Sequence, residues 1–154
     1  CTDRTWLGNG SVGDDRQGHV DEIARFVNFD TVLLAYERDP SDANHALSVD
    51  NLARLHAAAE HQPLNVVLLP FPRAVIMNGQ RLPASYANFY IANDVVIVPT
   101  FNDVNDRLAL ETIAAVFPDR RVVGLHAVDL VWGLGTLHCL TQQQPAMAMG
   151  DSGP

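Results

Sequence analysis

The sequence predicts a mixed α/β fold built from a repeated module of strand, strand, helix and strand. Short apolar runs rich in β-branched residues are typical of buried strands, and they recur along the chain. Two longer segments between these runs have the alanine and leucine content of helices. The order of elements also repeats, because residues 30–34 align with residues 94–98. The length of 154 residues is that of one compact domain.

The individual elements follow from these patterns. Predicted strands cover 31–37, 65–71, 94–101 and 121–125. The first helix is predicted over 45–61, where five residues fall on one face at three- and four-residue steps: Val49, Leu52, Ala53, His56 and Ala59. The second helix is predicted over 103–119, with Asp103 or Asn105 as its N-cap and Pro118 at its end.

The segments between and after the two modules are also predicted from local chemistry. The Asn78-Gly79 pair and its flanking prolines indicate a hairpin or loop over 72–87. Residues 135–143 resemble the opening strand of a third module. We expect residues 147–154, which are rich in Met, Gly and Ser, to form a flexible tail.

Composition excludes several classes of protein. The formal charge is -8 and every cationic side chain among the 10 is arginine, so no basic patch is available for nucleic acid. No apolar run reaches the roughly 18 residues of a membrane span, and the first residues lack the profile of a secretory signal. We therefore expect a soluble cytoplasmic protein. Cys1 and Cys139 lie far apart in the sequence, which indicates neither a disulfide framework nor a zinc ribbon.

The first polar cluster that could carry chemistry contains His19 and Asp21. They follow a glycine and are two positions apart, so they would point the same way in an extended segment. A surface histidine near acidic residues is the commoner explanation of such a pattern. Asp14 and Asp15 equally suit a turn or a helix cap.

The second cluster surrounds Cys139, with glycines before it and the glutamines 142–144 after it. A lone cysteine in an apolar strand is most often a small buried hydrophobe. The glutamines favour a loop that faces a polar cavity, because amides are costly to bury without partners. His138 would point to the opposite face of a strand, so a general base for Cys139 would have to come from elsewhere. The polar residues 102–106 are explained by helix capping.

Four blocks of this chain together resemble the agmatine deiminase family, which is related to the peptidylarginine deiminases and other guanidine-modifying enzymes. They are GDDRQGHVDEIARF, RLPASYANFYIAN, VPTFNDVNDRLALE and DLVWGLGTLHCLTQQQPA. The resemblance implies a pseudo-fivefold α/β propeller whose blades are small strand-strand-helix-strand modules. On this basis residues 1–146 correspond to the C-terminal half of such a propeller: about two modules and the first strand of another.

The resemblance also implies a role for each matching residue. Cys139 matches the nucleophile, His19 the acid/base and Asp21 the carboxylate that holds the guanidinium, while Asp15 matches an acid that helps to bind the substrate. The implied reaction hydrolyses agmatine to N-carbamoylputrescine and ammonia, a step of putrescine biosynthesis, through a thiouronium on the cysteine. It requires no metal and no organic cofactor. A thiolate suits attack on a guanidinium carbon, and a carboxylate fits its planar fork of N–H groups.

Three alternatives remain open. A protein-arginine deiminase would use the same centre on a different substrate. If the chain lacks an N-terminal half, it would alone be a catalytically silent fragment or an interaction subunit. The open edges of such a partial propeller would then favour self-association or pairing with the missing half. A papain-type amidase fits less well, because its cysteine usually precedes its histidine in the sequence.

Overall fold

The computed structural model describes residues 5–14 and 18–144 of the chain. The candidate substrate-binding Asp15 and the tail predicted over 147–154 therefore lie outside the described residues. Within them, strands form two three-stranded sheets and a two-stranded hairpin, and two α-helices accompany the sheets. The mixed α/β class predicted from the sequence is confirmed.

The first module begins with a 3-10 helix, η1 (Val20–Glu22), followed by β1 (Ala24–Phe26) and β2 (Thr31–Tyr36). Helix α1 (Asn44–Ala59) then leads to β3 (Asn65–Pro70). The sheet order is β1-β2-β3, in which β1 is antiparallel and β3 parallel to the central strand β2. This is the predicted sequence of strand, strand, helix and strand.

The second module repeats this topology with β6 (Tyr90–Ile91), β7 (Val95–Thr100), α2 (Asp106–Val116) and β8 (Arg121–His126). Its sheet order is β6-β7-β8, again antiparallel and then parallel. The same backbone contact opens the parallel pair in both modules: Asn65 donates to the carbonyl of Asp30, and Arg121 to that of Asp94. The repeat predicted from the sequence is confirmed.

A hairpin of β4 (Ile76–Met77) and β5 (Gln80–Arg81) connects the modules. Asn78 and Gly79 form its turn with φ angles of 49° and 79°. Two successive positive φ angles define a type I′ turn, for which Asn-Gly is the favoured pair. The hairpin predicted at this dipeptide is confirmed.

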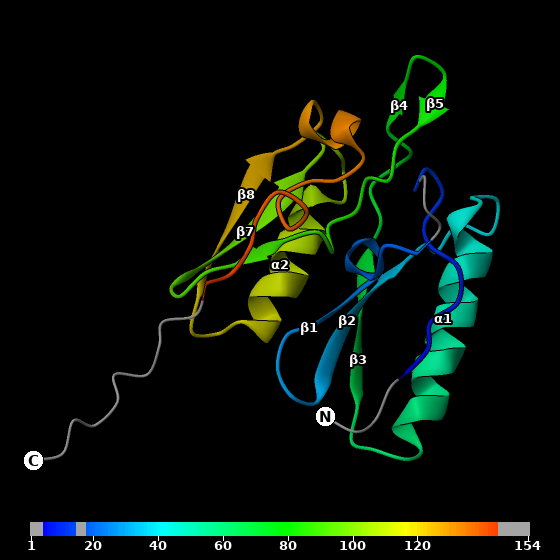
Figure 1. Ribbon diagram of the computed structural model, residues 1–154, viewed down its shortest axis with the longest axis vertical. Helices are drawn as coiled ribbons and strands as arrows, with labels where there is room; N and C mark the ends of the chain where they lie inside the picture. The colour runs from blue at the N-terminus through cyan, green and yellow to red at the C-terminus, as the bar shows by residue number, and fades with distance from the viewer. Residues whose placement is uncertain (1–4, 15–17, 145–154) are drawn as a thin grey trace, which may run out of the picture.

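The modules pack as alternating layers. Figure 1 shows α1 on the outer face of the first sheet and α2 between the two sheets. Strand β2 is buried on both faces, and its side chains alternate accordingly. Val32 and Leu34 belong to the cluster on the α1 side, whereas Leu33 and Ala35 belong to the main core shared with the second module.

The buried face of α1 differs from the apolar face seen in the sequence. Its buried residues are Asn44, Ser48, Asn51 and Leu55, whereas Val49 is 44% exposed. The reason is hydrogen bonding: the side-chain oxygens of Asn44, Ser48 and Asn51 accept backbone N–H groups of Val12, Glu37 and Gly8. The helix therefore uses polar residues to hold the N-terminal segment and the end of β2.

The polar residues before α2 have structural partners, but the side-chain capping predicted for them is not found: Asn105 is at the N-cap position without a capping hydrogen bond. Its side chain donates instead to the carbonyl of Phe71. The carboxylate of Asp106 accepts the N–H groups of Phe101 and Asp103 and the hydroxyl of Tyr86. These residues order the loop that leads into α2.

The predicted strand over 135–143 is wrong. After β8 the chain forms a 3-10 helix, η2 (Leu130–Gly133), and then a turn, and no strand follows within the described residues up to 144. The turn forms because the N–H groups of His138 and Leu140 find nearby carbonyls at Asn88 and Thr136 instead of a neighbouring strand. Both sheets are open, so the propeller remains a prediction.

Among the residues that the structure describes, neither helix combines the length and the apolar character required to cross a bilayer.

Candidate active site

The turn that carries Cys139 lies against the short helix that carries Asp21. The sulfur of Cys139 donates to Oδ2 of Asp21 over 3.0 Å, although 118 positions separate the two residues in the sequence. The side-chain amide of Asn88 donates to both groups, over 3.1 Å to the sulfur and 2.8 Å to the same Asp21 oxygen. A thiol, a carboxylate and an amide therefore meet at one point.

Close packing around the sulfur explains the local sequence. A Cβ atom at position 135 would lie 2.7 Å from the sulfur of Cys139, so glycine is needed there. Cys139 is exposed as a residue, but partial burial of its thiol and the hydrogen bond to Asp21 raise the pKa of Cys139 to about 11, while the N–H of Asn88 acts in the opposite direction. In this arrangement the thiol keeps its proton at neutral pH.

Glu22 is a second acid beside the thiol. Its residue is 1% exposed, one carboxyl oxygen lies 3.8 Å from the sulfur of Cys139, and the other has no hydrogen-bond partner among the described residues. Burial, followed by the charges of Asp21 and Asp14, raises its pKa to about 9. Glu22 is therefore a neutral acid at neutral pH.

The same three side chains have the spacing of a metal site. One ligand atom each from Asp21, Glu22 and Cys139 lies within 4.8 Å of the others. A metal would need Glu22 and Cys139 as anions, so its binding would have to displace two protons that the site holds at neutral pH.

His19 belongs to the site through a pocket that it shares with Cys139. This pocket, of about 340 Å³, is also lined by the glycines of the 133–135 segment. Asp14 holds it in place: one carboxylate oxygen accepts the N–H groups of Gly18 and His19, and the other lies 3.7 Å from the imidazole. This is the turn that the sequence allowed for Asp14.

The segment from His19 to Asp21 is not extended throughout, contrary to the expectation from their spacing: His19 has extended backbone angles, but the 3-10 helix begins at the next residue. His19 precedes η1, and Asp21 lies within it. The two side chains nevertheless both reach Cys139's surroundings, one by lining its pocket and the other by direct contact. A 3-10 turn brings them there because the chain must bend sharply from the loop into β1.

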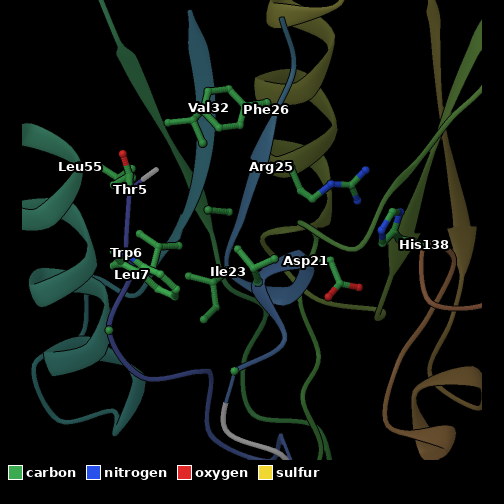
Figure 2. Close-up of a pocket in the computed structure, with 14 residues that line it drawn as sticks. Thr5, Trp6, Leu7, Asp21, Ile23, Arg25, Phe26, Val32, Leu55 and His138 are labelled. Carbon is green, nitrogen blue, oxygen red and sulfur yellow. The ribbon is translucent and has the colours of Figure 1, made fainter. Parts of the chain in front are cut away.

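A larger pocket, of about 570 Å³, is lined by Asp21 but not by Cys139. Figure 2 shows the side chains of Asp21, Arg25 and His138 grouped at one side of it, with apolar residues such as Trp6 and Ile23 at the other. Burial and the charge of Arg25 lower the pKa of His138, and its Nδ1 is buried without a partner among the described residues. His138 is therefore a neutral imidazole.

His138 and Cys139 line different pockets, although the strand from which this was inferred does not exist. The glutamines 142–144 lie in exposed irregular chain, as expected of a loop. The site thus joins Cys139 and Asp21 directly and includes His19 through a shared pocket.

Two residues of the site were not recognised from the sequence. Glu22 follows Asp21 directly and reads as a surface acid, yet it is buried. Asn88 stands in an apolar run between Ala87 and Phe89, and all three are fully buried. A polar amide in such a run must find partners, and this was the available signal for Asn88.

Comparison with known proteins agrees with the resemblance seen in the motifs. The family model of the Porphyromonas-type peptidyl-arginine deiminases matches residues 1–145. A protein of Latilactobacillus sakei named "Putative agmatine deiminase" is 37% identical, and the match covers 92% of this chain and 44% of that protein.

Solved structures give the same result. The agmatine deiminase of Enterococcus faecalis is 35% identical with a TM-score of 0.84, and the match covers 92% of this chain and 44% of that one. The agmatine deiminase of C. jejuni is 28% identical with a TM-score of 0.80, covering 88% and 40%. The chain thus spans less than half the length of these relatives. It belongs to the Porphyromonas-type peptidyl-arginine deiminase family, a family of guanidine-modifying hydrolases in which several of its relatives carry the name agmatine deiminase.

Proposed function

We propose that this chain carries the Cys-His-Asp centre of an agmatine deiminase, with Cys139 as nucleophile, His19 as acid/base and Asp21 as the carboxylate that holds the guanidinium. The contact of 3.0 Å between the sulfur and Asp21 carries this proposal. A carboxylate at that distance from a nucleophile can hold the N–H fork of a guanidinium so that its carbon lies next to the sulfur. Asp15 remains a proposed substrate contact.

The reaction is a covalent substitution at the guanidinium carbon. The thiolate of Cys139 forms a C–S bond while the C=N electron pair moves to nitrogen. Imidazolium His19 protonates one amino nitrogen, the C–N bond breaks, and ammonia leaves a thiouronium on the cysteine. Neutral His19 then takes a proton from water, whose oxygen adds to the carbon. Cleavage of the C–S bond returns the thiolate and leaves the ureido product, N-carbamoylputrescine, whose extra proton passes to solvent.

The raised pKa of Cys139 fits a cationic substrate. Asp21 accepts a hydrogen bond from the thiol in the present arrangement, so a guanidinium that binds Asp21 must replace this hydrogen bond. Its positive charge next to the sulfur favours the thiolate and lowers the pKa of Cys139. The nucleophile would then be activated only when a cation of the right shape is bound.

Protein-arginine deiminase activity is the second candidate, and the description of the matching family favours it. Agmatine and peptidyl-arginine present the same guanidinium, so the groups around Asp21 suit both. What distinguishes them is the distal amine or peptide.

The test compares agmatine with an N-acyl-arginine amide, with ammonia and ureido product measured for each. We expect Cys139→Ala to abolish turnover and His19→Gln to reduce it at least about a hundredfold, as for loss of a general acid/base. His56→Gln is the control, because His56 is an exposed histidine on α1. Turnover that survives in Cys139→Ala would refute the proposal.

Mass spectrometry after treatment with chloroacetamidine shows whether Cys139 is reactive, independently of whether this chain holds every group that turnover needs. We expect the reagent, which carries an amidinium, to label Cys139 in the wild type and not in Cys139→Ala. Labelling without turnover of either substrate would favour the silent-fragment alternative, in which the site needs groups that this chain does not supply.

We further infer that the two modules are blades of a larger propeller, and that residues 1–146 form one part of it. The packing repeats: the face of the first sheet with Leu33 and Leu69 packs in the core with α2, the helix of the next module. The corresponding face of the second sheet carries Ile97, Val123 and Leu125, of which Val123 is 37% and Leu125 48% exposed. Another module, from a second copy or from a longer chain, would cover this face as α2 covers the first.

A further inference from the structure

The cluster of Asp21, Glu22 and Cys139 contains a buried carboxyl oxygen with no partner. Glu22 is 1% exposed, and its Oε2 makes no hydrogen bond with any residue that the structure describes. Its other oxygen, Oε1, lies 3.8 Å from the sulfur of Cys139, so the carboxyl group is directed at the thiol. Buried polar atoms nearly always have a partner, and an orphaned oxygen of this kind indicates a place for a water molecule or an ion.

The distances within the cluster fit tetrahedral coordination of one cation. A tetrahedral zinc has Zn–S bonds of about 2.3 Å and Zn–O bonds of about 2.1 Å, which places a sulfur and an oxygen ligand about 3.6 Å apart. The sulfur of Cys139 lies 3.0 Å from Asp21 and 3.8 Å from Glu22, on either side of this value. One ligand atom from each residue lies within 4.8 Å of the other two. Small side-chain rotations would bring all three to bonding distance.

The ligand types select the class of cation. Mg²⁺ and Ca²⁺ take oxygen ligands, roughly six to eight of them, whereas Zn²⁺ combines sulfur and oxygen ligands in sets of about four. A thiol that coordinates such a cation loses its proton outright. The protons of Cys139 and Glu22 would pass to solvent as the metal binds, so the cation must have a high affinity for sulfur.

The cluster can be reached from one side and is closed on the other. Cys139 is exposed and lines a pocket of about 340 Å³ together with His19. A cation that enters through this pocket meets the sulfur first and has room there for a water molecule as its fourth ligand. The buried Glu22 supplies a ligand from the interior.

We propose that Cys139, Asp21 and Glu22 reversibly bind a thiophilic divalent cation such as Zn²⁺, and that this cation prevents the thiol from reacting. The binding follows from the cluster itself. Its effect on turnover rests on the proposed function, because the cation would occupy both the sulfur that attacks the guanidinium and the carboxylate that holds it. Zinc is therefore an inhibitor of this site and not its cofactor.

The first experiment titrates the protein with Co²⁺, a spectroscopic substitute for Zn²⁺, and follows the absorbance of the cobalt–thiolate bond. All proteins carry Cys1→Ser, because Cys1 is the second of the two thiols in the chain. We expect the band to appear, to disappear when Zn²⁺ displaces Co²⁺, and to be absent after the further change Cys139→Ser. A band that survives Cys139→Ser would overturn the proposal.

Glu22→Gln tests the buried ligand in the same titration. Loss of a contact outside the ligand shell already costs about 10- to 100-fold in metal affinity, so loss of a ligand should weaken Co²⁺ binding at least about tenfold. The control is Glu60→Gln, the same change at an exposed position at the end of α1. Equal affinities in the two variants would show that Glu22 is not a ligand and would overturn the three-residue site.

The second experiment uses the wild type and so does not depend on the folding of a variant. Iodoacetamide alkylates Cys139 with and without Zn²⁺, and peptide mass spectrometry resolves Cys139 from Cys1. We expect saturating Zn²⁺ to slow alkylation at least about tenfold, EDTA to restore the rate, and Mg²⁺ to have no effect, because the bound thiolate is no longer free to react. No protection by Zn²⁺, or equal protection by Mg²⁺, would overturn the proposal.

Both experiments measure binding without turnover, so the two proposals can fail separately. A chain that binds Zn²⁺ at Cys139 and processes no guanidine refutes only the proposed function. A chain that processes agmatine and does not bind Zn²⁺ refutes only the cation site. Where both hold, we expect Zn²⁺ to inhibit turnover and increasing agmatine to relieve the inhibition, since both ligands need Asp21 and the sulfur.

Discussion

The neutral Glu22 next to Cys139 makes a stability prediction that can be worked out from the structure. Its pKa rises from an ordinary 4.5 to about 9, mainly because the side chain is buried. Between these two values the unfolded chain releases the proton while the folded protein retains it. The free energy of unfolding therefore falls with rising pH, by about 1.4 kcal/mol for each pH unit.

Glu22→Gln removes this dependence, since the amide has nearly the same shape and no proton to lose. From pH 5 to pH 8 the free energy of unfolding of the wild type should fall by about 4 kcal/mol relative to that of the variant, because three pH units contribute about 1.4 kcal/mol each. The contributions of the other titrating groups largely cancel in this comparison. We therefore expect the variant to be similar to the wild type at pH 5 and clearly more stable at pH 8.

The assay is urea unfolding of both proteins at pH 5, 6.5 and 8, with the free energy extrapolated to water. Glu60→Gln is the control, because it makes the same chemical change at an exposed position at the end of α1. If the difference between Glu22→Gln and the wild type is the same at all three pH values, Glu22 is not a buried neutral acid and the reasoning is refuted.

Two further predictions concern an exposed apolar face and a hydrogen bond of a buried tyrosine. Leu125→Asp places a charge on the exposed apolar face of the second sheet. If the wild type self-associates through this face, sedimentation velocity should show mainly monomer for the variant. A variant that assembles to the same extent as the wild type would exclude this face as the interface. Tyr86→Phe removes the hydroxyl that donates to Asp106 over 2.7 Å, and because the acceptor is a carboxylate we expect a loss of about 2 kcal/mol in urea unfolding. Tyr36→Phe is the matched change at a half-buried tyrosine, and equal small losses in both variants would contradict the importance of the Tyr86 contact.

Local patterns in the sequence were sufficient for the secondary structure of the two modules. The strands over 31–37 and 94–101 could be predicted because their apolar, β-branched residues are buried in β2 and β7. The turn at Asn78-Gly79 could be predicted because positive φ angles favour these residues. The repeat was visible because the same elements follow one another in the same order.

Local patterns failed where the partner of a residue lies far away in the sequence. The segment 135–143 has the composition of a strand, but Asn88 supplies acceptors that hold its backbone in a turn. Helix α1 has an apolar face, but its polar face is buried because backbone N–H groups of the N-terminal segment need acceptors. In both cases distant hydrogen bonds outweighed local propensity.

The sequence by itself determined the module, its repeat and, through motifs, which residues to examine: Cys139, His19 and Asp21. Only the tertiary structure decided how they meet: Cys139 is hydrogen-bonded to Asp21, His19 lines the same pocket as Cys139, Asn88 contacts both Asp21 and Cys139, and Glu22 is neutral beside the thiol. The physical reason is that periodicity and turn chemistry act over a few residues. Burial, and with it the protonation of an acid and the partners of an amide, depends on segments that only folding brings together.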